Sequence, residues 1–344
     1  METHLMQTRK PTVALTLGDP AGIGPELIAK LLSDPQCLAQ ANIVLVGDRW
    51  LWEQGMKTAG LTVATRSIGS LAAARSSACD LPLFTEVRSI DPTQVQVGKA
   101  DPAGGASVLK VLDQCMDAVL ARHIDAICFA PLNKHAMRQS GMGFEDELHY
   151  FADYLKVAGY FCEFNTLDGL WTSRVSSHVP FKEAASYITQ ERIVQASRLI
   201  YDSLKAAGNH APRVAVAALN PHGGDGGSCG REEIDIIKPA VDELNALGYA
   251  VLGPYPADTI FLKARDKQVD AIVTMYHDQG QIAIKLMGFE KGVTVQGGLP
   301  IPITTPAHGT AYDIAGTNQA NVTATKNAFL IAARMGLSYL EQNR

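Results

Sequence analysis

Short apolar runs alternate with amphipathic segments along most of this chain. Continuous apolar runs are typical of buried strands, and we predict strands at 12–17, 42–46, 125–130, 160–165, 169–176, 214–219, 271–275 and 293–296. Helical periodicity predicts helices at 26–32, 50–59, 106–122, 148–157, 191–207, 232–247 and 321–340. Strands that alternate with helices favour a mainly parallel sheet with helices on both faces. In the middle of the chain, a turn at 167–169 joins two strands directly.

Composition narrows the class of protein. The 344 residues are enough for two domains or one large α/β unit. The net charge of −5 argues against a nucleic-acid surface, because such proteins usually carry a basic excess. No apolar run is long enough to cross a membrane, and the six cysteines form no C-x-x-C pair, which is typical of thiols in a reducing compartment. We expect a cytoplasmic protein without nucleic-acid or membrane partners, with residues 1–10 as a loose tail.

One late segment, at 305–316, combines a histidine, two glycines, several small residues and an aspartate. Such a loop lets the backbone approach a flat ligand closely, and Asp313 can accept hydrogen bonds from ribose hydroxyls. No G-x-G-x-x-G follows the first predicted strand. The segment therefore indicates a nicotinamide enzyme that is not a Rossmann protein.

Three histidines share one context. His178, His222 and His277 each follow an apolar run and precede a turn. Open α/β sheets bind ligands at the carboxyl ends of their strands, so three imidazoles there could converge on one divalent metal. The alternative is that each is a turn residue bonded to backbone. The matching contexts favour the metal, and neutral imidazoles favour zinc, cobalt or nickel over magnesium.

The first predicted strand leads into a turn rich in glycine, at 18–26. Exposed backbone N–H groups near a helix N-terminus make an anion site. The alternative is a tight turn in which Pro25 occupies the first helical turn and Glu26 complements the helix dipole. The residues alone leave both open.

With these segments in place, the chain resembles the 4-hydroxythreonine-4-phosphate dehydrogenase family of vitamin B6 synthesis. The resemblance runs nearly end to end. It rests on GDPAGIGPE (18–26), APLNK (130–134), SHVP (177–180), NPHGG (220–224), PADT (256–259), YHDQG (276–280) and HGTA (308–311). The family is similar to the isocitrate and isopropylmalate dehydrogenases, which implies two intertwined α/β domains with a cleft between them. We place the first domain at 11–130 plus about 280–344, and the second at about 131–279.

The resemblance also implies roles for particular residues. It implies that His178, His222 and His277 hold one divalent metal, which we expect to be zinc, with magnesium, manganese or cobalt as alternatives. Lys285 matches a substrate-binding lysine, and Asp258 and Asp278 match acidic residues of the same pocket, as partners of imidazoles or as proton carriers. Family members are homodimers that complete each active site with residues of both subunits.

At the cofactor end, the resemblance implies that the loop beginning at His308 and Gly309 holds the adenosine side of NAD. In the wider superfamily the residue five positions after this histidine contacts the ribose, and here that residue is Asp313. A carboxylate there repels a 2′-phosphate, which favours NAD over NADP. Asn321 falls where an adenine contact is expected.

The family chemistry removes hydride from a secondary alcohol next to a carboxylate-bearing carbon, and the β-keto acid then loses carbon dioxide. A metal would chelate the hydroxyl and carboxylate, lower the pKa of the alcohol and hold the developing enolate. The expected partner is a small hydroxy acid.

The chain departs from the family where substrate is held. Glu147 and Leu148 stand where the family has a His and a Thr, Thr294 replaces an Asn, and Ile303 replaces an Arg whose fork would bind an anion. Arg174, four residues before His178, could supply a relocated anion contact. Its alternative is an exposed, salt-bridging arginine.

These departures predict a rebuilt substrate pocket. We therefore expect either the family reaction itself or a paralogue that oxidises a phosphorylated sugar acid such as 4-phosphothreonate or an erythronate, or a carboxylated cis-dihydrodiol of the terephthalate type. Two remoter alternatives are an enzyme like the phosphate acyltransferases and a non-catalytic binding protein. Neither of them needs three histidines in matching positions.

Overall fold

The alternating pattern produces two α/β units. The structure is a computed structural model that describes residues 10–343, so the predicted tail lies outside the described residues except for Lys10. One unit is Met1–Glu145 with Gly309–Arg344, called unit 1, and the other is Asp146–His308, called unit 2. The predicted boundaries lie near 130 and 280, whereas the units divide after Glu145 and after His308. The second division falls later because the strand at Val293–Gly297 pairs with the one at Cys162–Leu167, and the strand at Ile303–Pro306 pairs with it in turn.

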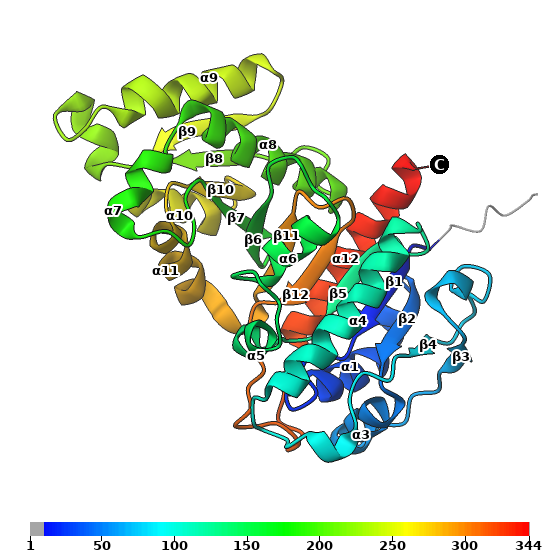
Figure 1. Cartoon of the computed structure of the whole chain (residues 1–344). Coiled ribbons are helices and arrows are strands. Elements are labelled where there is room, and N and C mark those ends of the chain that lie inside the picture. The colour runs from blue at the N-terminus through cyan, green and yellow to red at the C-terminus, as the bar shows by residue number, and fades with distance from the viewer. Residues whose placement is uncertain (1–9, 344) are drawn as a thin grey trace, which may run out of the picture. The chain divides into compact units, whose positions relative to one another are not determined.

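Unit 1 is built on parallel strands in the order β3-β4-β2-β1-β5. The strands are β1 (Thr12–Thr16), β2 (Asn42–Gly47), β3 (Arg66–Ile68), β4 (Leu83–Glu86) and β5 (Ala126–Phe129). The helices are α1 (Gly24–Leu32), α2 (Pro35–Leu38), α3 (Arg49–Ala59), α4 (Pro102–Leu120), α5 (Lys134–Gln139) and α12 (Thr323–Gln342). Figure 1 shows α4 and α12 running along these strands.

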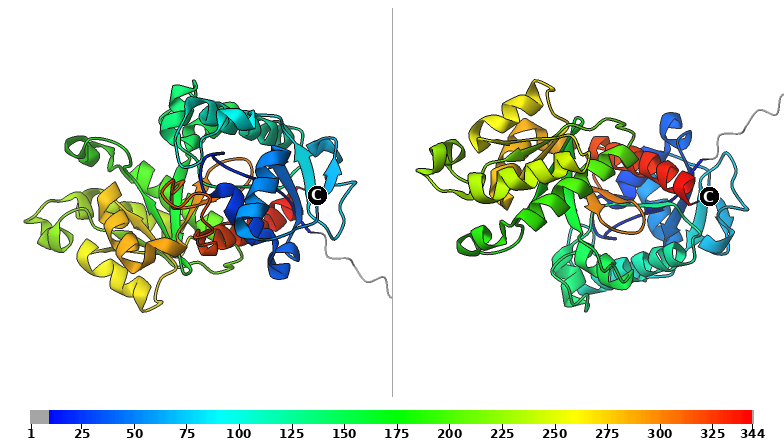
Figure 2. Two further views of the ribbon diagram at one scale, coloured as in Figure 1. Left: turned by 90° about the horizontal axis from the view of Figure 1, so that it is seen from below. Right: turned by 90° about the horizontal axis from the view of Figure 1, so that it is seen from above.

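The centre of unit 1 is buried on both faces. All five residues of β1 are buried, which is the reason for its continuous apolar run. Helices α4 and α12 lie on opposite faces of the strands (Figure 2). Helix α4 begins where Asp101 caps it, because the carboxylate accepts a hydrogen bond from the Ala103 N–H and Pro102 has no N–H to satisfy.

Unit 2 orders its strands β12-β11-β6-β7-β10-β8-β9. The strands are β6 (Cys162–Leu167), β7 (Leu170–Arg174), β8 (Val214–Ala217), β9 (Val251–Tyr255), β10 (Ala271–Thr274), β11 (Val293–Gly297) and β12 (Ile303–Pro306). The helices are α6 (Glu147–Tyr154), α7 (Phe181–Ala184), α8 (Gln190–Ala206), α9 (Lys238–Ala246), α10 (Ala257–Arg265) and α11 (His277–Gly288). Strands β7, β10, β8 and β9 are parallel neighbours, whereas β12, β11, β6 and β7 pair antiparallel.

The predicted turn between two strands is confirmed. Leu167 pairs with Leu170, and the two residues between them, Asp168 and Gly169, have φ of 47° and 90°. Two successive left-handed residues make the tight hairpin turn that matches strand twist, and Asp-Gly suits it. The mainly parallel prediction is right for all the strands of unit 1 and for β7, β10, β8 and β9 of unit 2, whereas β6, β11 and β12 pair antiparallel.

The helix predicted at 232–247 is broken in the structure. A π-helical turn spans Glu233–Ile237, and α9 follows from Lys238. Pro239, at the start of α9, lacks the N–H of a continuous helix, so the ladder of hydrogen bonds is interrupted there. Within the described part of the chain, no helix is both long and apolar enough to cross a membrane.

Close packing of α1 against α3 gives a test of unit 1. A Cβ added at Gly55 would lie 2.4 Å from the Pro25 carbonyl oxygen, so Gly55→Ala must push the helices apart. We expect chemical denaturation to show a loss of about 1–3 kcal/mol in unfolding free energy, the usual range for overpacking. Gly69→Ala is the control, because nothing lies within 4 Å of its added Cβ. Equal stability of the two variants would show that the helices separate freely.

Candidate active site

Two of the three predicted metal ligands lie together in unit 2. Strand β7 pairs in parallel with β10, with Arg174 opposite Thr274, and the pairing continues as Ser176 N–H donates to the Met275 carbonyl at 3.0 Å. Both strands therefore end at one edge of the sheet. His178 and His277 follow there, and their ring centroids are 5.6 Å apart.

A carboxylate lies beside each of these two imidazoles, and the one beside His277 is within hydrogen-bond distance. Asp278 Oδ1 lies 2.7 Å from His277 Nδ1, within hydrogen-bond distance, and Asp146 Oδ2 lies 3.7 Å from His178 Nδ1. A carboxylate that holds Nδ1–H leaves Nε2 as the basic nitrogen, the arrangement found behind metal-bound histidines. Asp146 is itself fixed, because it caps α6 by accepting from the His149 N–H.

His222 lies in a loop of unusual backbone conformation after β8. Five successive residues are left-handed: His222 (φ 54°), Gly223 (68°), Gly224 (81°), Asp225 (44°) and Gly226 (64°). A left-handed residue other than glycine costs about 1 kcal/mol or more and persists only when its surroundings hold it. Contacts from outside the loop must therefore hold it in this conformation.

Glu233 provides these contacts. Its Oε1 accepts hydrogen bonds from the Leu219 and Asn220 N–H groups, both at 2.8 Å, and its Oε2 accepts one from Asn220 Nδ2 at 2.9 Å. Burial tends to raise the pKa of Glu233, but the hydrogen bonds from Asn220 and Leu219 outweigh it and hold the pKa below the ordinary 4.5. The carboxylate is thus charged at neutral pH and satisfied by the loop's backbone.

His222 faces a cavity of ≈ 650 Å³ in unit 2. Asp258, Tyr276 and Gln279 also line it. Across residues 10–343, the three predicted ligands do not form a group whose ligand atoms lie within 4.8 Å of one another. The donor set suits a divalent metal, with two oriented imidazoles adjacent and a third on the cavity beside Tyr276, the neighbour of His277.

The predicted substrate lysine lies on α11. His277, Gln281 and Lys285 follow one another at four-residue spacing, so they share a helix face, and Lys285 is exposed. Gln281 Nε2 donates to Asn165 Oδ1 on β6. This contact fixes the face of α11 against the end of the sheet.

Arg174 is an interior residue, only 5% exposed, so its interpretation as an exposed surface arginine is wrong. Its guanidinium donates to Asn165 Oδ1 at 2.8 Å and to Ser177 Oγ at 2.9 Å, and Glu163 Oε1 lies 3.5 Å away. Thr294 belongs to the same network, because its Oγ1 accepts from Asn165 Nδ2 at 3.3 Å.

The other altered substrate positions are buried. Glu147 and Leu148, in the first turn of α6, are 5% and 4% exposed. Glu147 Oε1 lies 3.5 Å from Gln296 Nε2, and Ile303 is fully buried in β12. These side chains belong to the interior of unit 2.

The predicted cofactor residues fall on both sides of a unit boundary. His308 is the last residue of unit 2, while Gly309, Asp313 and Asn321 belong to unit 1 and are exposed. The side-chain oxygen of Asn321 accepts from the Thr323 N–H at 2.9 Å. Asp313 lies in the turn after Thr310, with its carboxylate open to solvent.

The glycines of the first turn allow close packing of the backbone. The prediction of an anion site at this turn is therefore wrong. Gly24, Pro25 and Glu26 are buried, so the start of α1 is closed. A Cβ at Gly24 would lie 2.1 Å from the Leu17 carbonyl oxygen. Glu26 Oε1 accepts from the Ala320 N–H at 2.9 Å instead of facing a ligand.

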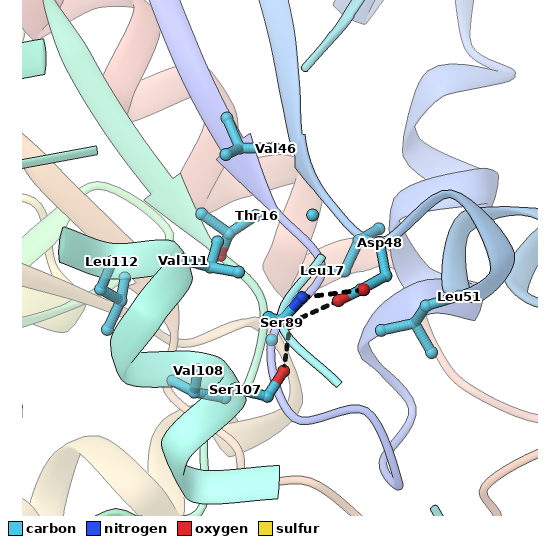
Figure 3. Close-up of a pocket in the computed structure, with 12 residues that line it drawn as sticks. Thr16, Leu17, Val46, Asp48, Leu51, Ser89, Ser107, Val108, Val111 and Leu112 are labelled. Atoms are coloured by element: carbon cyan, nitrogen blue, oxygen red, sulfur yellow. Dashed lines mark hydrogen bonds between the residues drawn. The ribbon is translucent and has the colours of Figure 1, made fainter. Parts of the chain in front are cut away.

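A small cavity beside this turn is too small for a ligand. It measures about 10 Å³, room for one water at most. Figure 3 shows its polar wall, where Asp48 accepts from the Ser89 N–H at 3.0 Å and from Ser89 Oγ, which lies 2.6 Å from Ser107 Oγ. This cluster ties β2 to α4.

Sequence reasoning missed several residues that shape the site: Asp146, Asn165, Glu233 and Gln281. Asp146 was findable, because an aspartate three residues before His149 at a predicted helix start is a capping pattern. The others act across 13 to 129 residues of sequence. No local pattern reveals such pairs.

Glu233→Gln tests the hold on the His222 loop. A Gln side chain has one acceptor oxygen, whereas both carboxylate oxygens of Glu233 accept hydrogen bonds from the loop. We therefore expect a loss of about 1–3 kcal/mol in unfolding free energy at pH 7. Because the pKa of Glu233 is lowered in the folded protein, its stabilisation is present above 4.5 and is lost as the pH falls below that value. Denaturant titrations across pH should show the difference narrowing in acid, with exposed Glu290→Gln as control. A difference independent of pH would contradict this role.

Comparison with known proteins agrees with this geometry. A protein of Pseudomonas aeruginosa named "Putative 4-hydroxythreonine-4-phosphate dehydrogenase 2" is 52% identical over 328 residues, 95% of this chain and 97% of that protein. One of Symbiobacterium thermophilum named "Putative D-threonate 4-phosphate dehydrogenase" is 34% identical, covering 97% and 99%.

A solved structure shows the same fold. The crystal structure of 4-hydroxythreonine-4-phosphate dehydrogenase from Klebsiella pneumoniae superposes with a TM-score of 0.80 at 31% identity, covering 95% of this chain and 99% of that one. The family model for the pyridoxal phosphate biosynthetic protein PdxA matches residues 39–332. The chain is therefore an α/β oxidoreductase that belongs to the PdxA family, the dehydrogenase family that its motifs resemble.

Proposed function

We propose that this protein is an NAD-dependent, divalent-metal-dependent dehydrogenase that oxidises a phosphorylated four-carbon hydroxy acid and then decarboxylates the product. The observation that carries the proposal is the pair of adjacent imidazoles, His178 and His277, that follow the ends of neighbouring parallel strands. Both relatives named above act, by their names, on four-carbon acids that carry a 4-phosphate.

His178, His222 and His277 would hold the metal, and zinc is the ion that three neutral imidazoles suit best. Bound there, it would supply Lewis acidity that lowers the pKa of the substrate hydroxyl and stabilises negative charge on the product of oxidation. Asp278, within hydrogen-bond distance of His277 Nδ1, would hold a proton there and so leave Nε2 as the ligand atom.

The protein's own residues bind substrate and move protons. Lys285, exposed on the His277 face of α11, offers a cation for an anionic group of the substrate. Asp258 lines the cavity with His222 and Tyr276 and can take the alcohol proton. Arg174 adds buried positive charge behind the strand ends, where a carboxylate or phosphate gains most from it.

Asp313 supports the choice of cofactor. Its exposed carboxylate can accept from both ribose hydroxyls and would repel a 2′-phosphate. Gly309, at the start of the same loop, has nothing within 4 Å of an added Cβ, which leaves room for a ligand against the backbone. His308 and Asn321 flank the loop and would complete the adenosine contacts.

A homodimer with a shared active site is part of the proposal. Phe181, Ile282 and Leu286 are 77%, 60% and 84% exposed, and the Phe181 ring lies 5.4 Å from that of Tyr276, next to His277. Large apolar side chains exposed beside a polar site usually mark an interface. The free cysteines of the described chain are consistent with a cytoplasmic enzyme.

The metal is tested by chelation. Treatment with a chelator should abolish NADH formation, and zinc should restore it, because the substrate alcohol is otherwise too weak an acid. His277→Ala should lower kcat by about a hundredfold or more, whereas His210→Ala, an exposed turn residue, should match wild type. Full activity after complete metal removal would refute the metal-dependent mechanism.

The substrate is tested by comparing two phosphorylated acids. Because Glu147, Leu148, Thr294 and Ile303 replace the family's substrate contacts, we expect kcat/KM for 4-phosphothreonate to exceed that for 4-hydroxythreonine-4-phosphate by about tenfold, the effect of about 1.4 kcal/mol of transition-state binding. NADH absorbance with saturating zinc measures both. A carboxylated cis-dihydrodiol, lacking the phosphate, should turn over poorly. The reverse preference would assign the protein to vitamin B6 synthesis.

A further inference from the structure

The glycine-rich first turn and the loop at 309–316 are packed together within unit 1. Ile23 N–H donates to the Thr310 carbonyl at 3.1 Å. A Cβ on Gly22 would lie 3.0 Å from Thr310 Cβ, so the two backbones meet where a side chain would interfere. The loop that carries Asp313 therefore takes its position from the turn at 18–24.

A side-chain network fastens the same loop at its centre. Tyr312 Oη donates to Asp19 Oδ2 at 2.8 Å, and Asn133 Nδ2 donates to Tyr312 Oη at 3.1 Å. Asp19 is 2% exposed, and its other oxygen accepts from the Ala21 N–H at 2.8 Å. Burial raises the pKa of Asp19 and that of Tyr312. The Tyr312 hydroxyl is thus the hydrogen-bond donor that Asp19 Oδ2, an oxygen of a buried carboxyl group, requires.

The loop needs a fastening because its backbone is strained. Ala311 has φ of 42°, a left-handed conformation that alanine rarely adopts. On the other side of the loop, a Cβ on Gly98 would lie 2.9 Å from the Tyr312 carbonyl oxygen, and Gly98 N–H donates to the Ala21 carbonyl at 2.8 Å. Three segments distant in sequence thus enclose Tyr312 and hold Ala311 in place.

We propose that Tyr312, anchored by Asp19 and Asn133, is a positioning residue that fixes the 309–316 loop in the conformation that presents Asp313 to the dinucleotide. The proposal rests on the proposed NAD dependence. In this role Tyr312 acts through the loop and not on the cofactor: its hydroxyl is directed to Asp19 in the interior, while the next side chain, Asp313, is exposed. Pre-ordering a loop raises affinity because the entropy of ordering is not lost at binding.

The cofactor-free protein offers the first test. In Tyr312→Phe the ring remains but Asp19 Oδ2 loses its donor, so the turn closed by Ile314 N–H on the Ala311 carbonyl and by Thr317 N–H on the Ile314 carbonyl should open more often. We expect amide hydrogen exchange at these positions to accelerate by about tenfold, the effect of one lost hydrogen bond. Tyr339→Phe, a Tyr-to-Phe change in the last turns of α12, is the matched control and should leave exchange unchanged.

Cofactor binding offers the second test. The dissociation constant of NADH, followed by its fluorescence, and the KM for NAD should each rise about fivefold to tenfold in Tyr312→Phe, while kcat at saturating NAD stays the same. Asp19→Asn keeps an oxygen for the Ala21 N–H but places an N–H where Tyr312 Oη needs an acceptor, so it should weaken binding similarly. The double variant should be no weaker than the worse single one, because both changes disrupt the same hydrogen bond.

The outcomes distinguish failure of this positioning role from failure of the proposed NAD dependence. If wild type fails to bind NADH, the NAD dependence fails and the positioning role falls with it. If wild type binds but Tyr312→Phe binds equally, or if the effects of Asp19→Asn and Tyr312→Phe multiply, the positioning role alone is overturned. A fall in kcat at unchanged KM would likewise overturn it.

Discussion

The parallel pairing of β7 with β10 is the constraint on which the site depends. Parallel neighbours end at the same edge, so a register that sets Arg174 against Thr274 delivers His178 and His277 side by side. A shift of one residue would move one strand end by about 3.3 Å along the sheet and separate the two rings. The carboxylate of Asp278, within hydrogen-bond distance of His277 Nδ1, then orients one of the rings. The chemistry thus depends on strand register before it depends on any loop.

Much of this architecture could be predicted from the chain's periodicity. Buried strands such as β1 and β8 are continuous apolar runs, and α4, α8 and α12 begin within about four residues of their predicted starts. Some short or interrupted strands were not predicted: β9 contains Gly253 and Pro254, and β12 is only four residues long. The antiparallel pairing of β6 with β11 was not foreseeable, because it joins segments more than a hundred residues apart.

The site residues follow the same distinction: those marked by a local pattern could be predicted, and those joined across the sequence could not. Strand-end histidines were identifiable because the signal, an apolar run followed by a turn, is local. The network around Asn165 was not, since it gathers Arg174, Gln281 and Thr294 from three other elements. The first turn shows the limit of motif reasoning. Its glycines suggested an anion site, but they are needed for backbone contact with Leu17 and Thr310, which only the folded chain brings near.

The left-handed loop at His222 has an evolutionary consequence. Residues with a branched Cβ are strongly disfavoured at its five left-handed positions by sterics, so Val, Ile or Thr there would be selected against whatever the effect on chemistry. The buried Glu233 is similarly constrained by the backbone it satisfies. Drift in substrate preference must therefore proceed elsewhere in the site. A lineage can change the acid it oxidises while the third imidazole stays where it is.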